Sequence, residues 1–112
     1  MAGSIENFFF AWGAPDDRRD AIIKEAVADD VAYEDPRGAV AGVQALCDYV
    51  AQFSANAPGA AAEVADTNET DGIHAVRVRF FGEGWEQFGQ YNVHLNDEGR
   101  MSKITGVAEK NA

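Results

Sequence analysis

The 112-residue chain has 46% hydrophobic and 25% charged residues, a composition typical of an ordinary globular protein and too apolar for a disordered one. Its 19 Asp and Glu residues outnumber 9 Lys and Arg residues, and the resulting net charge of -10 argues against a nucleic-acid partner or an anionic membrane partner. The length suits a single domain over residues 1–112, with one hydrophobic core and no internal boundary.

The chain offers no targeting signal and no spanning segment. No basic stretch precedes the first apolar segment, and no run approaches the roughly 18 apolar residues of a membrane-spanning helix, so we expect a cytoplasmic protein. The single cysteine, Cys47, cannot form an internal disulfide. We interpret it as a small core residue because it shares a helical stripe with Leu46 and Val50.

The first half of the chain predicts three helices and one strand. The helices are expected from Ile5 to Trp12 with Ser4 as the cap, from a cap at Asp16 or Asp17 to about Val27, and from about Val43 to Ser54. Asp29 and Asp30 should break the second helix, and residues 31–35 form the strand that follows.

From Ala61 onward the hydrophobic period changes to two, which is typical of strands. Three hairpin signals, Asp71-Gly72, residues 82–84 and residues 96–99, separate four extended segments of an antiparallel meander. We therefore predict an α+β fold in which about three N-terminal helices pack on one face of a curved antiparallel sheet. The inward face of that sheet should carry His74, Val76, Val78, Phe80, Gly89, Tyr91, Val93 and Leu95.

The opposite face of the predicted sheet is mixed in character. It should carry Arg77, Arg79, Phe81, Phe88 and Gln90. An uncovered face with aromatic area often supports self-association, so we expect a homodimer formed through this face.

Asp35 is the most informative polar residue, because it ends an apolar row. Alternation along the strand places Val31, Tyr33 and Asp35 on one face, and Pro36 stops the strand and holds Asp35 in an extended conformation. With no Lys or Arg assigned to that face, the carboxylate suits a general base in apolar surroundings. The alternative is an Asp that caps its own turn by accepting backbone N–H groups.

Residues 28–38, followed by Gly42 and a helix with Tyr49, resemble the steroid Δ-isomerase and SnoaL-like cyclase families. These families share the nuclear-transport-factor-2-like cone fold, and the order of elements agrees over essentially the whole chain. The resemblance implies that Asp35 shuttles a proton beside a carbonyl, and that two donors stabilise the enolate oxygen. The position of the family's donor Tyr holds Phe8, which cannot donate, and the position of its donor Asp holds Tyr91, which can.

The predicted site is an apolar pocket for a small apolar or ring-like ligand. Its catalytic candidates are Asp35, Tyr91 and His74, although Tyr91 and His74 also suit ordinary core positions. The candidate ligand-binding residues are Phe8, Trp12, Tyr33, Tyr49, Phe53, Val78, Phe80 and Val93. We expect no metal and no other cofactor, because the histidines share no face with a carboxylate and no glycine pair forms a phosphate loop.

Three functional interpretations stay open at this point. The first is an isomerase or cyclase that transfers a proton beside a carbonyl, with Asp35 as the base. The second is a non-catalytic module that holds a hydrophobic ligand in the same cavity. The third is a dimerisation domain whose core is closed.

Overall fold

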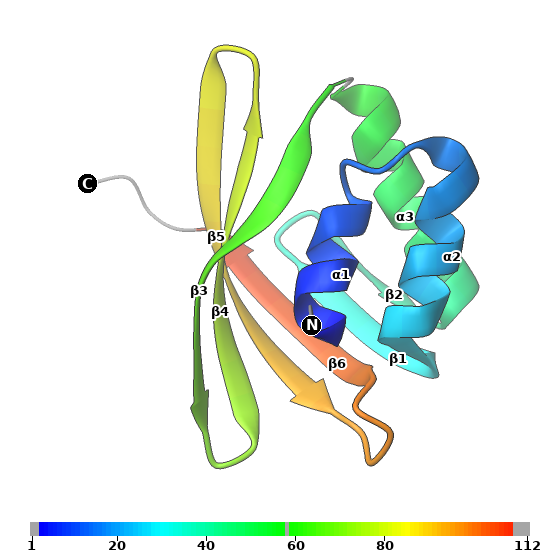
Figure 1. Cartoon of the computed structure of the whole chain (residues 1–112), viewed down its shortest axis with the longest axis vertical. Helices are drawn as coiled ribbons and strands as arrows, with labels where there is room; N and C mark the ends of the chain where they lie inside the picture. The colour runs from blue at the N-terminus through cyan, green and yellow to red at the C-terminus, as the bar shows by residue number, and fades with distance from the viewer. Residues whose placement is uncertain (1–2, 58, 109–112) are drawn as a thin grey trace.

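The computed structural model describes residues 3–57 and 59–108, which form three helices and six strands (Figure 1). The helices are α1 (Ser4–Ala11), α2 (Asp16–Ala26) and α3 (Val43–Asn56). The strands are β1 (Val27–Asp35), β2 (Gly38–Ala41), β3 (Ala61–Thr70), β4 (Ile73–Gly82), β5 (Trp85–Leu95) and β6 (Met101–Ala108). They form one sheet in the order β2-β1-β6-β5-β4-β3, in which only the β1–β6 pair among these strands is parallel.

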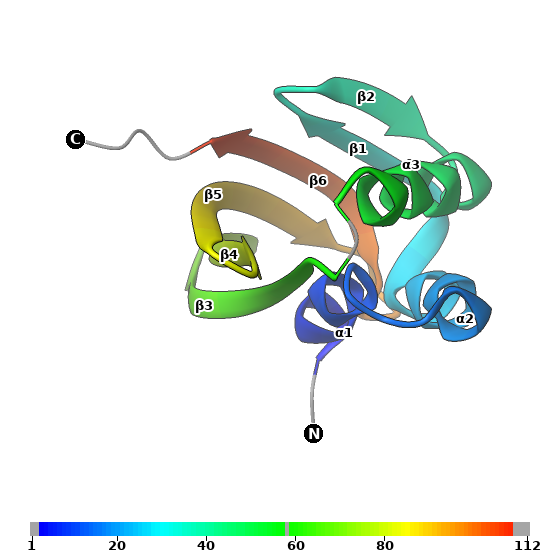
Figure 2. The same cartoon turned by 90° about the horizontal axis from the view of Figure 1, so that it is seen from above.

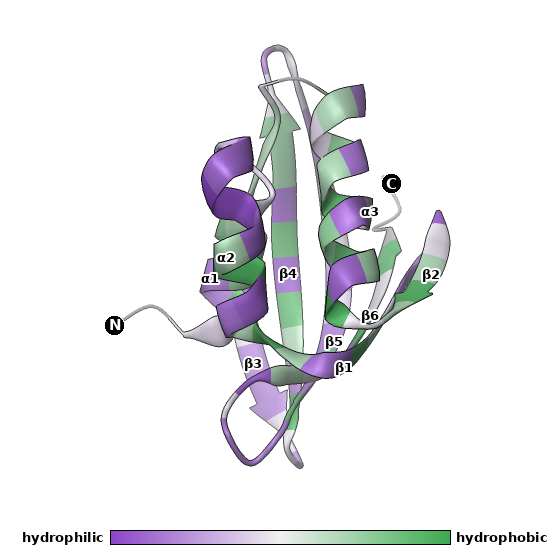
Figure 3. Ribbon diagram, turned by 90° about the vertical axis from the view of Figure 1, so that its right-hand side faces the viewer, coloured by the Kyte–Doolittle hydropathy of each residue, from purple (hydrophilic) through white to green (hydrophobic). Residues whose placement is uncertain are grey.

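The sheet is curved but not closed, and the three helices lie on its concave side (Figure 2). Helix α1 packs against β3, while α3 packs against β1 and β2 at the other edge. Polar and apolar bands alternate along the helices in Figure 3, as expected for helices with one face on a core. This architecture confirms the predicted α+β class with a cone-shaped fold.

Helix α1 shows why the helical spacing was informative. Phe8, Phe9 and Trp12 are fully buried, whereas Phe10 on the opposite side is 65% exposed. The predicted cap is wrong: Gly3 is the N-cap, and the hydroxyl of Ser4 instead donates to the carbonyl of Gly99 at 2.7 Å. The Ser4 hydroxyl, which was expected to cap the helix, therefore binds the distant β5–β6 turn instead.

The end of α2 agrees with the prediction to within one residue, but its cap and the segment after it differ. Pro15 is the N-cap rather than Asp16 or Asp17, and the helix stops at Ala26. Val27 already pairs with Met101 of β6, so Asp29 and Asp30 lie inside β1 as exposed residues. Pairing with a strand more than 70 residues away along the chain decides this boundary, and no local signal near Asp29 reveals it.

The sheet confirms the three predicted hairpins and adds one strand. Asp71 and Gly72 have φ of 54° and 81°, the left-handed conformations that a two-residue hairpin turn needs. The added strand, β2, pairs antiparallel with β1 after the turn at Pro36 and Arg37. Its sequence, Gly-Ala-Val-Ala, has little strand propensity, which explains why it was not predicted.

The inward face of the sheet agrees with the alternation in the sequence. Val76, Val78 and Phe80 of β4 and Tyr91 and Val93 of β5 are all buried in the core. Within residues 3–57 and 59–108, no helix is both long and apolar enough to cross a membrane.

Candidate functional site

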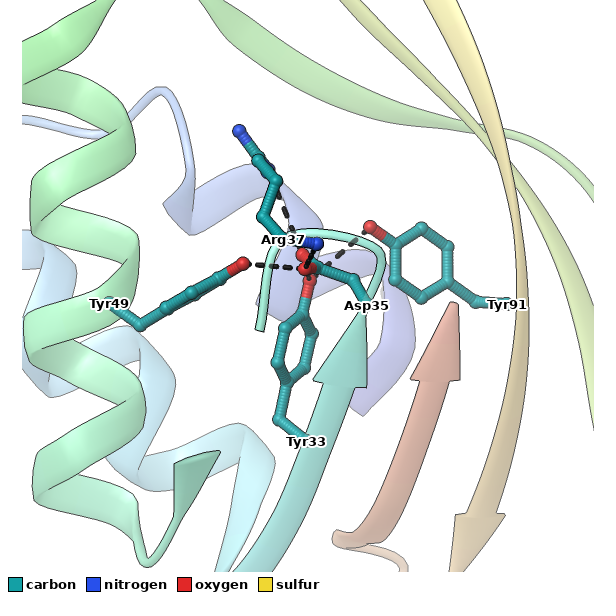
Figure 4. Close-up of polar contacts among 5 residues, drawn as sticks. All are labelled: Tyr33, Asp35, Arg37, Tyr49 and Tyr91. Carbon is teal, nitrogen blue, oxygen red and sulfur yellow. Dashed lines mark hydrogen bonds and ion pairs between the residues drawn. The ribbon is translucent and has the colours of Figure 1, made fainter. Parts of the chain in front are cut away.

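Asp35 is a buried carboxylate, only 7% exposed, at the end of β1. Its Oδ1 accepts hydrogen bonds from the backbone N–H of Arg37 at 2.9 Å and from the hydroxyl of Tyr49 at 2.5 Å. Its Oδ2 accepts a hydrogen bond from the hydroxyl of Tyr33 at 2.7 Å, and the Arg37 guanidinium lies 3.7 Å away (Figure 4). These donors replace the water that the carboxylate loses on burial.

The structure confirms the turn-capping interpretation of Asp35. The bond from the N–H of Arg37 is the expected turn cap, since it spans two residues. The expectation that no Lys or Arg shares its face is wrong. The turn at Pro36 reverses the chain, and the Arg37 guanidinium folds back over the carboxylate.

Tyr91 joins this arrangement through Tyr33. Their hydroxyl oxygens lie 3.3 Å apart. Since the one hydroxyl proton of Tyr33 is donated to Asp35, the oxygen of Tyr33 accepts the proton of Tyr91. The order of donation is therefore Tyr91 to Tyr33 to Asp35, and Tyr91 is the member that can turn its O–H toward a ligand.

The three hydroxyls stay protonated at neutral pH. Burial, together with Tyr91 and Asp35, raises the pKa of Tyr33 far above the ordinary tyrosine value. Burial raises the pKa of Tyr91 to about 12. Burial and the bond to Asp35 raise the pKa of Tyr49 to about 12. Tyr33, Tyr49 and Tyr91 are also all the tyrosines of the chain, so every tyrosine lies in this site.

Three elements supply these groups, and a fourth makes room for one of them. Alternation along β1 puts Tyr33 and Asp35 on the inward face, and α3 carries Tyr49 across to them. Tyr91 comes from β5 (Figure 4), where it pairs with Gly106 of β6, and its ring packs closely against this glycine. A Cβ at position 106 would come within 2.6 Å of Cδ2 and 2.8 Å of Cζ of Tyr91, so only glycine leaves room for this ring.

A pocket of about 300 Å³ opens beside Asp35. Aromatic side chains from α3, β4 and β5 form much of its wall, and Asp35 and Arg37 are the charged residues among those that line it. The lining residues are Asp35, Pro36, Arg37, Phe53, Asn56, Ala57, Phe80, Trp85, Gln87, Phe88, Gly89, Tyr91 and Val107. The pocket is thus apolar along its walls and polar at the end that holds the carboxylate.

The structure divides the predicted ligand-binding residues into three groups. Phe53 and Phe80 line the pocket, and Tyr33 and Tyr49 bind Asp35. The remaining four are fully buried in the core and are not among the pocket-lining residues: Phe8, Trp12, Val78 and Val93.

Of the three predicted catalytic residues, the structure brings together Asp35 and Tyr91 but not His74. His74 pairs with Val93, which pairs with Ile104, which in turn pairs with Tyr33 of β1. Three strand spacings of roughly 4.8 Å put it on the order of 14 Å from β1. His74 is half-buried and does not line the pocket.

Besides Asn56 at the end of α3, the sequence did not indicate four polar or aromatic residues of the wall: Arg37, Trp85, Gln87 and Phe88, the last of which was expected on the opposite face of the sheet. For Arg37 a signal existed, since a residue two positions after a turn-forming Asp lies beside its carboxylate. The others follow the β4–β5 turn, where strand alternation gives no information about the end of the sheet. In the described part of the chain, no group of three or more His, Cys, Asp or Glu side chains could hold a metal.

Cys47 is buried as predicted. Burial, with Asp20 nearby, raises the pKa of its thiol to about 11, so the thiol is not a nucleophile at neutral pH.

Three helices on the concave side of a curved six-stranded mixed sheet define a nuclear-transport-factor-2-like cone fold. A proposed isomerase of the SnoaL-like family from Agrobacterium tumefaciens has this fold: the TM-score is 0.85 and the identity 21%, over 96% of this chain and 95% of that one. A proposed polyketide cyclase from Sinorhizobium meliloti (TM-score 0.78, 19% identity, 95% and 94% covered) is similar too. So is a proposed ketosteroid isomerase from Kribbella flavida (TM-score 0.75, 18% identity, 97% and 77% covered). No protein-family model and no curated protein matches the sequence.

Proposed function

We propose that this protein transfers a proton beside the carbonyl group of a small ring-like substrate, as an isomerase or cyclase does. The observation that carries the proposal is a buried carboxylate, Asp35, at the polar end of an apolar pocket, with the hydroxyl of Tyr91 linked to it through Tyr33. The names of the similar structures, an isomerase and a polyketide cyclase among them, support the same class of chemistry.

In the proposed reaction Asp35 is the base. Each carboxylate oxygen has two lone pairs, and Oδ2 accepts a single hydrogen bond from the described residues, so one lone pair is left for a substrate proton. Asp35 removes a proton from the carbon beside the carbonyl, and the electron pair of that C–H bond passes into an enolate. Tyr91 donates its O–H to the enolate oxygen instead of to Tyr33. Asp35 then returns the proton to another carbon, or the enolate carbon attacks a second carbonyl, whose oxygen takes the electron pair of the C=O bond and the proton held by Asp35.

The test uses the conversion of β,γ-unsaturated cyclic ketones to conjugated enones and the exchange of their α-protons for deuterium. We expect Asp35→Asn to lower both rates by roughly 100-fold or more, because an amide cannot accept the proton. Tyr91→Phe should lower them by about 100- to 1000-fold, the usual cost of losing a donor to the oxyanion. Asp29→Asn, an exposed residue of the same strand, is the matched control and should leave both rates unchanged. Equal rates for Asp35→Asn and the wild type would contradict the proposal.

A second candidate function is non-catalytic binding of a hydrophobic ligand, and one observation favours it. Asp35 already accepts three hydrogen bonds, which suits a carboxylate that shapes the pocket rather than one that takes up protons. In that case the wild type converts none of the β,γ-unsaturated cyclic ketones, while an apolar ring compound still raises its melting temperature.

A further inference from the structure

We propose that Arg37 binds an acidic group of the ligand, so that the pocket takes a ring-like carboxylic acid. The inference rests on the proposed function only for the place of the ligand, which is the pocket beside Asp35. It names the chemical class of the ligand and assigns Arg37 as the residue that selects it.

The first step is the charge of the pocket. Asp35 and Arg37 are the charged residues among those that line it. The carboxylate of Asp35 is 2% exposed and already holds bonds from Tyr33, Tyr49 and a backbone N–H, so its charge is largely offset inside the protein. The side chain of Arg37 is 58% exposed, so its charge faces the pocket entrance and solvent.

The second step is the geometry of the guanidinium. Its 3.7 Å contact with Asp35 Oδ2 is an ion pair that is too long for a hydrogen bond, and its central carbon lies 5.6 Å from the centre of the Phe53 ring. A guanidinium presents five N–H donors in a planar fork that matches a carboxylate. A ligand carboxylate can take two of these donors while the ion pair to Asp35 is kept, and charges then alternate along the row of carboxylate, guanidinium and carboxylate.

The net charge of the chain limits the kind of anion that the pocket can bind. The chain has a net charge of -10, so a doubly charged phosphate would meet strong repulsion with a single guanidinium to offset it. A carboxylate carries one charge. The walls beyond Arg37, including Phe53, Phe80 and Trp85, offer aromatic faces to an apolar ring. A volume of about 300 Å³ is at the lower end of the range for small-molecule sites, which suits a ligand of one or two rings.

The experiment compares two ligands of nearly equal shape, 2-naphthoate and 2-naphthamide, by isothermal titration calorimetry at neutral pH. We expect the acid to bind the wild type about 10- to 100-fold more tightly than the amide, the usual worth of hydrogen bonds to a charged group. Arg37→Gln should remove this preference while leaving the affinity for the amide unchanged, and Arg37→Lys should retain part of it. If Arg37 only stabilised the structure, Arg37→Gln would lower the affinity for both ligands alike.

Arg18→Gln is the matched control, since it removes the same charge from the exposed surface of α2. It should leave the preference for the acid intact. The proposal is overturned if the wild type binds both compounds equally, if it binds neither at millimolar concentration, or if Arg18→Gln reduces the preference as much as Arg37→Gln. None of these measurements requires turnover, so a failure of the proposed reaction is separate from a failure of this assignment.

Discussion

Around Asp35, two hydroxyl groups and one backbone N–H replace the water that would bind an exposed carboxylate. Tyr33 and Tyr49 donate to it directly, and Tyr91 donates to Tyr33. Such a network is expensive to disturb, because any group that loses its partner stays buried without one.

Titration of the tyrosines reports on the site alone, because the chain has no tyrosine elsewhere. We expect the near-ultraviolet absorbance of tyrosinate to stay flat through pH 10, the ordinary tyrosine value, and to rise toward pH 12, where Tyr49 and Tyr91 ionise. Tyr91→Phe and Tyr49→Phe should each remove part of that rise. In denaturant the same chain should titrate near pH 10. A folded protein with a tyrosine that ionises near pH 10 would disagree with the described burial.

Asp35→Asn should lower the free energy of unfolding by about 1–3 kcal/mol at neutral pH. The substitution replaces one acceptor oxygen by an NH₂ group, which cannot accept the bonds that Tyr33 and Tyr49 now give to the two oxygens together. Urea unfolding measures the change, with the exposed Asp29→Asn as the control that should cost little. An Asp35→Asn protein as stable as the wild type would show that the network contributes little to folding.

Strand β6 supplies no polar group to the site, but it positions the two strands that carry Asp35 and Tyr91. It pairs parallel with β1 and antiparallel with β5, so it sets the separation of Asp35 and Tyr91. Gly106 of this strand is the point where the ring of Tyr91 lies on the backbone. The strand therefore needs a residue without a side chain at this one position.

Gly106→Ala should destabilise the protein by about 1–3 kcal/mol, because the new methyl group overlaps the Tyr91 ring. Gly38→Ala in β2 is the control: its Cβ would meet the Tyr49 ring at 4.0 Å, an ordinary contact. If the ring is the cause, Gly106→Ala should cost little in a Tyr91→Ala background, and unfolding of the four proteins of this double-mutant cycle measures the coupling. Additive effects would point to a cause other than the ring.

The molecule as a whole should lose stability in alkali. Since the folded-state pKa values of Tyr49 and Tyr91 lie above the unfolded value of about 10, the folded protein holds these protons more firmly. Their contribution is fully present below pH 10 and is lost as the pH rises from 10 through about 12. We expect the free energy of unfolding to fall between pH 10 and pH 12, and to fall less in Tyr91→Phe. An equal fall in both proteins would argue against this linkage.

We also propose that the outer face of the sheet forms a homodimer. On this face the guanidinium group of Arg79 lies 4.2 Å from the ring centre of Phe81. Sedimentation should then give twice the chain mass of 12.1 kDa, and Phe81→Glu should reduce it to a monomer. Phe10→Glu, an exposed aromatic residue on α1, should leave the mass unchanged. A wild-type monomer at micromolar concentration would rule the dimer out.

Features that depend on neighbours along the chain were predictable from the residues alone. The spacing of Phe8, Phe9 and Trp12 predicted the buried face of α1, and turn residues predicted all three hairpins of the meander. Alternation before Pro36 predicted that Asp35 would face inward at the end of its strand. These signals suffice because helix periodicity, strand alternation and turn chemistry act over a few residues.

Which residues meet at the site depends on contacts between distant segments of the chain, and these are known from the tertiary structure. Three contacts join segments that are far apart in the sequence. They are the parallel pairing of β1 with β6, the hydrogen bond from Tyr49 of α3 to Asp35, and the packing of the Tyr91 ring against Gly106. The tertiary structure also distinguishes Phe53 and Phe80, which line the pocket, from Phe8 and Trp12, which are buried in the core. All four are aromatic residues on predicted inward faces. Their roles differ because packing between elements, which no local pattern encodes, sets where the core ends and the pocket begins.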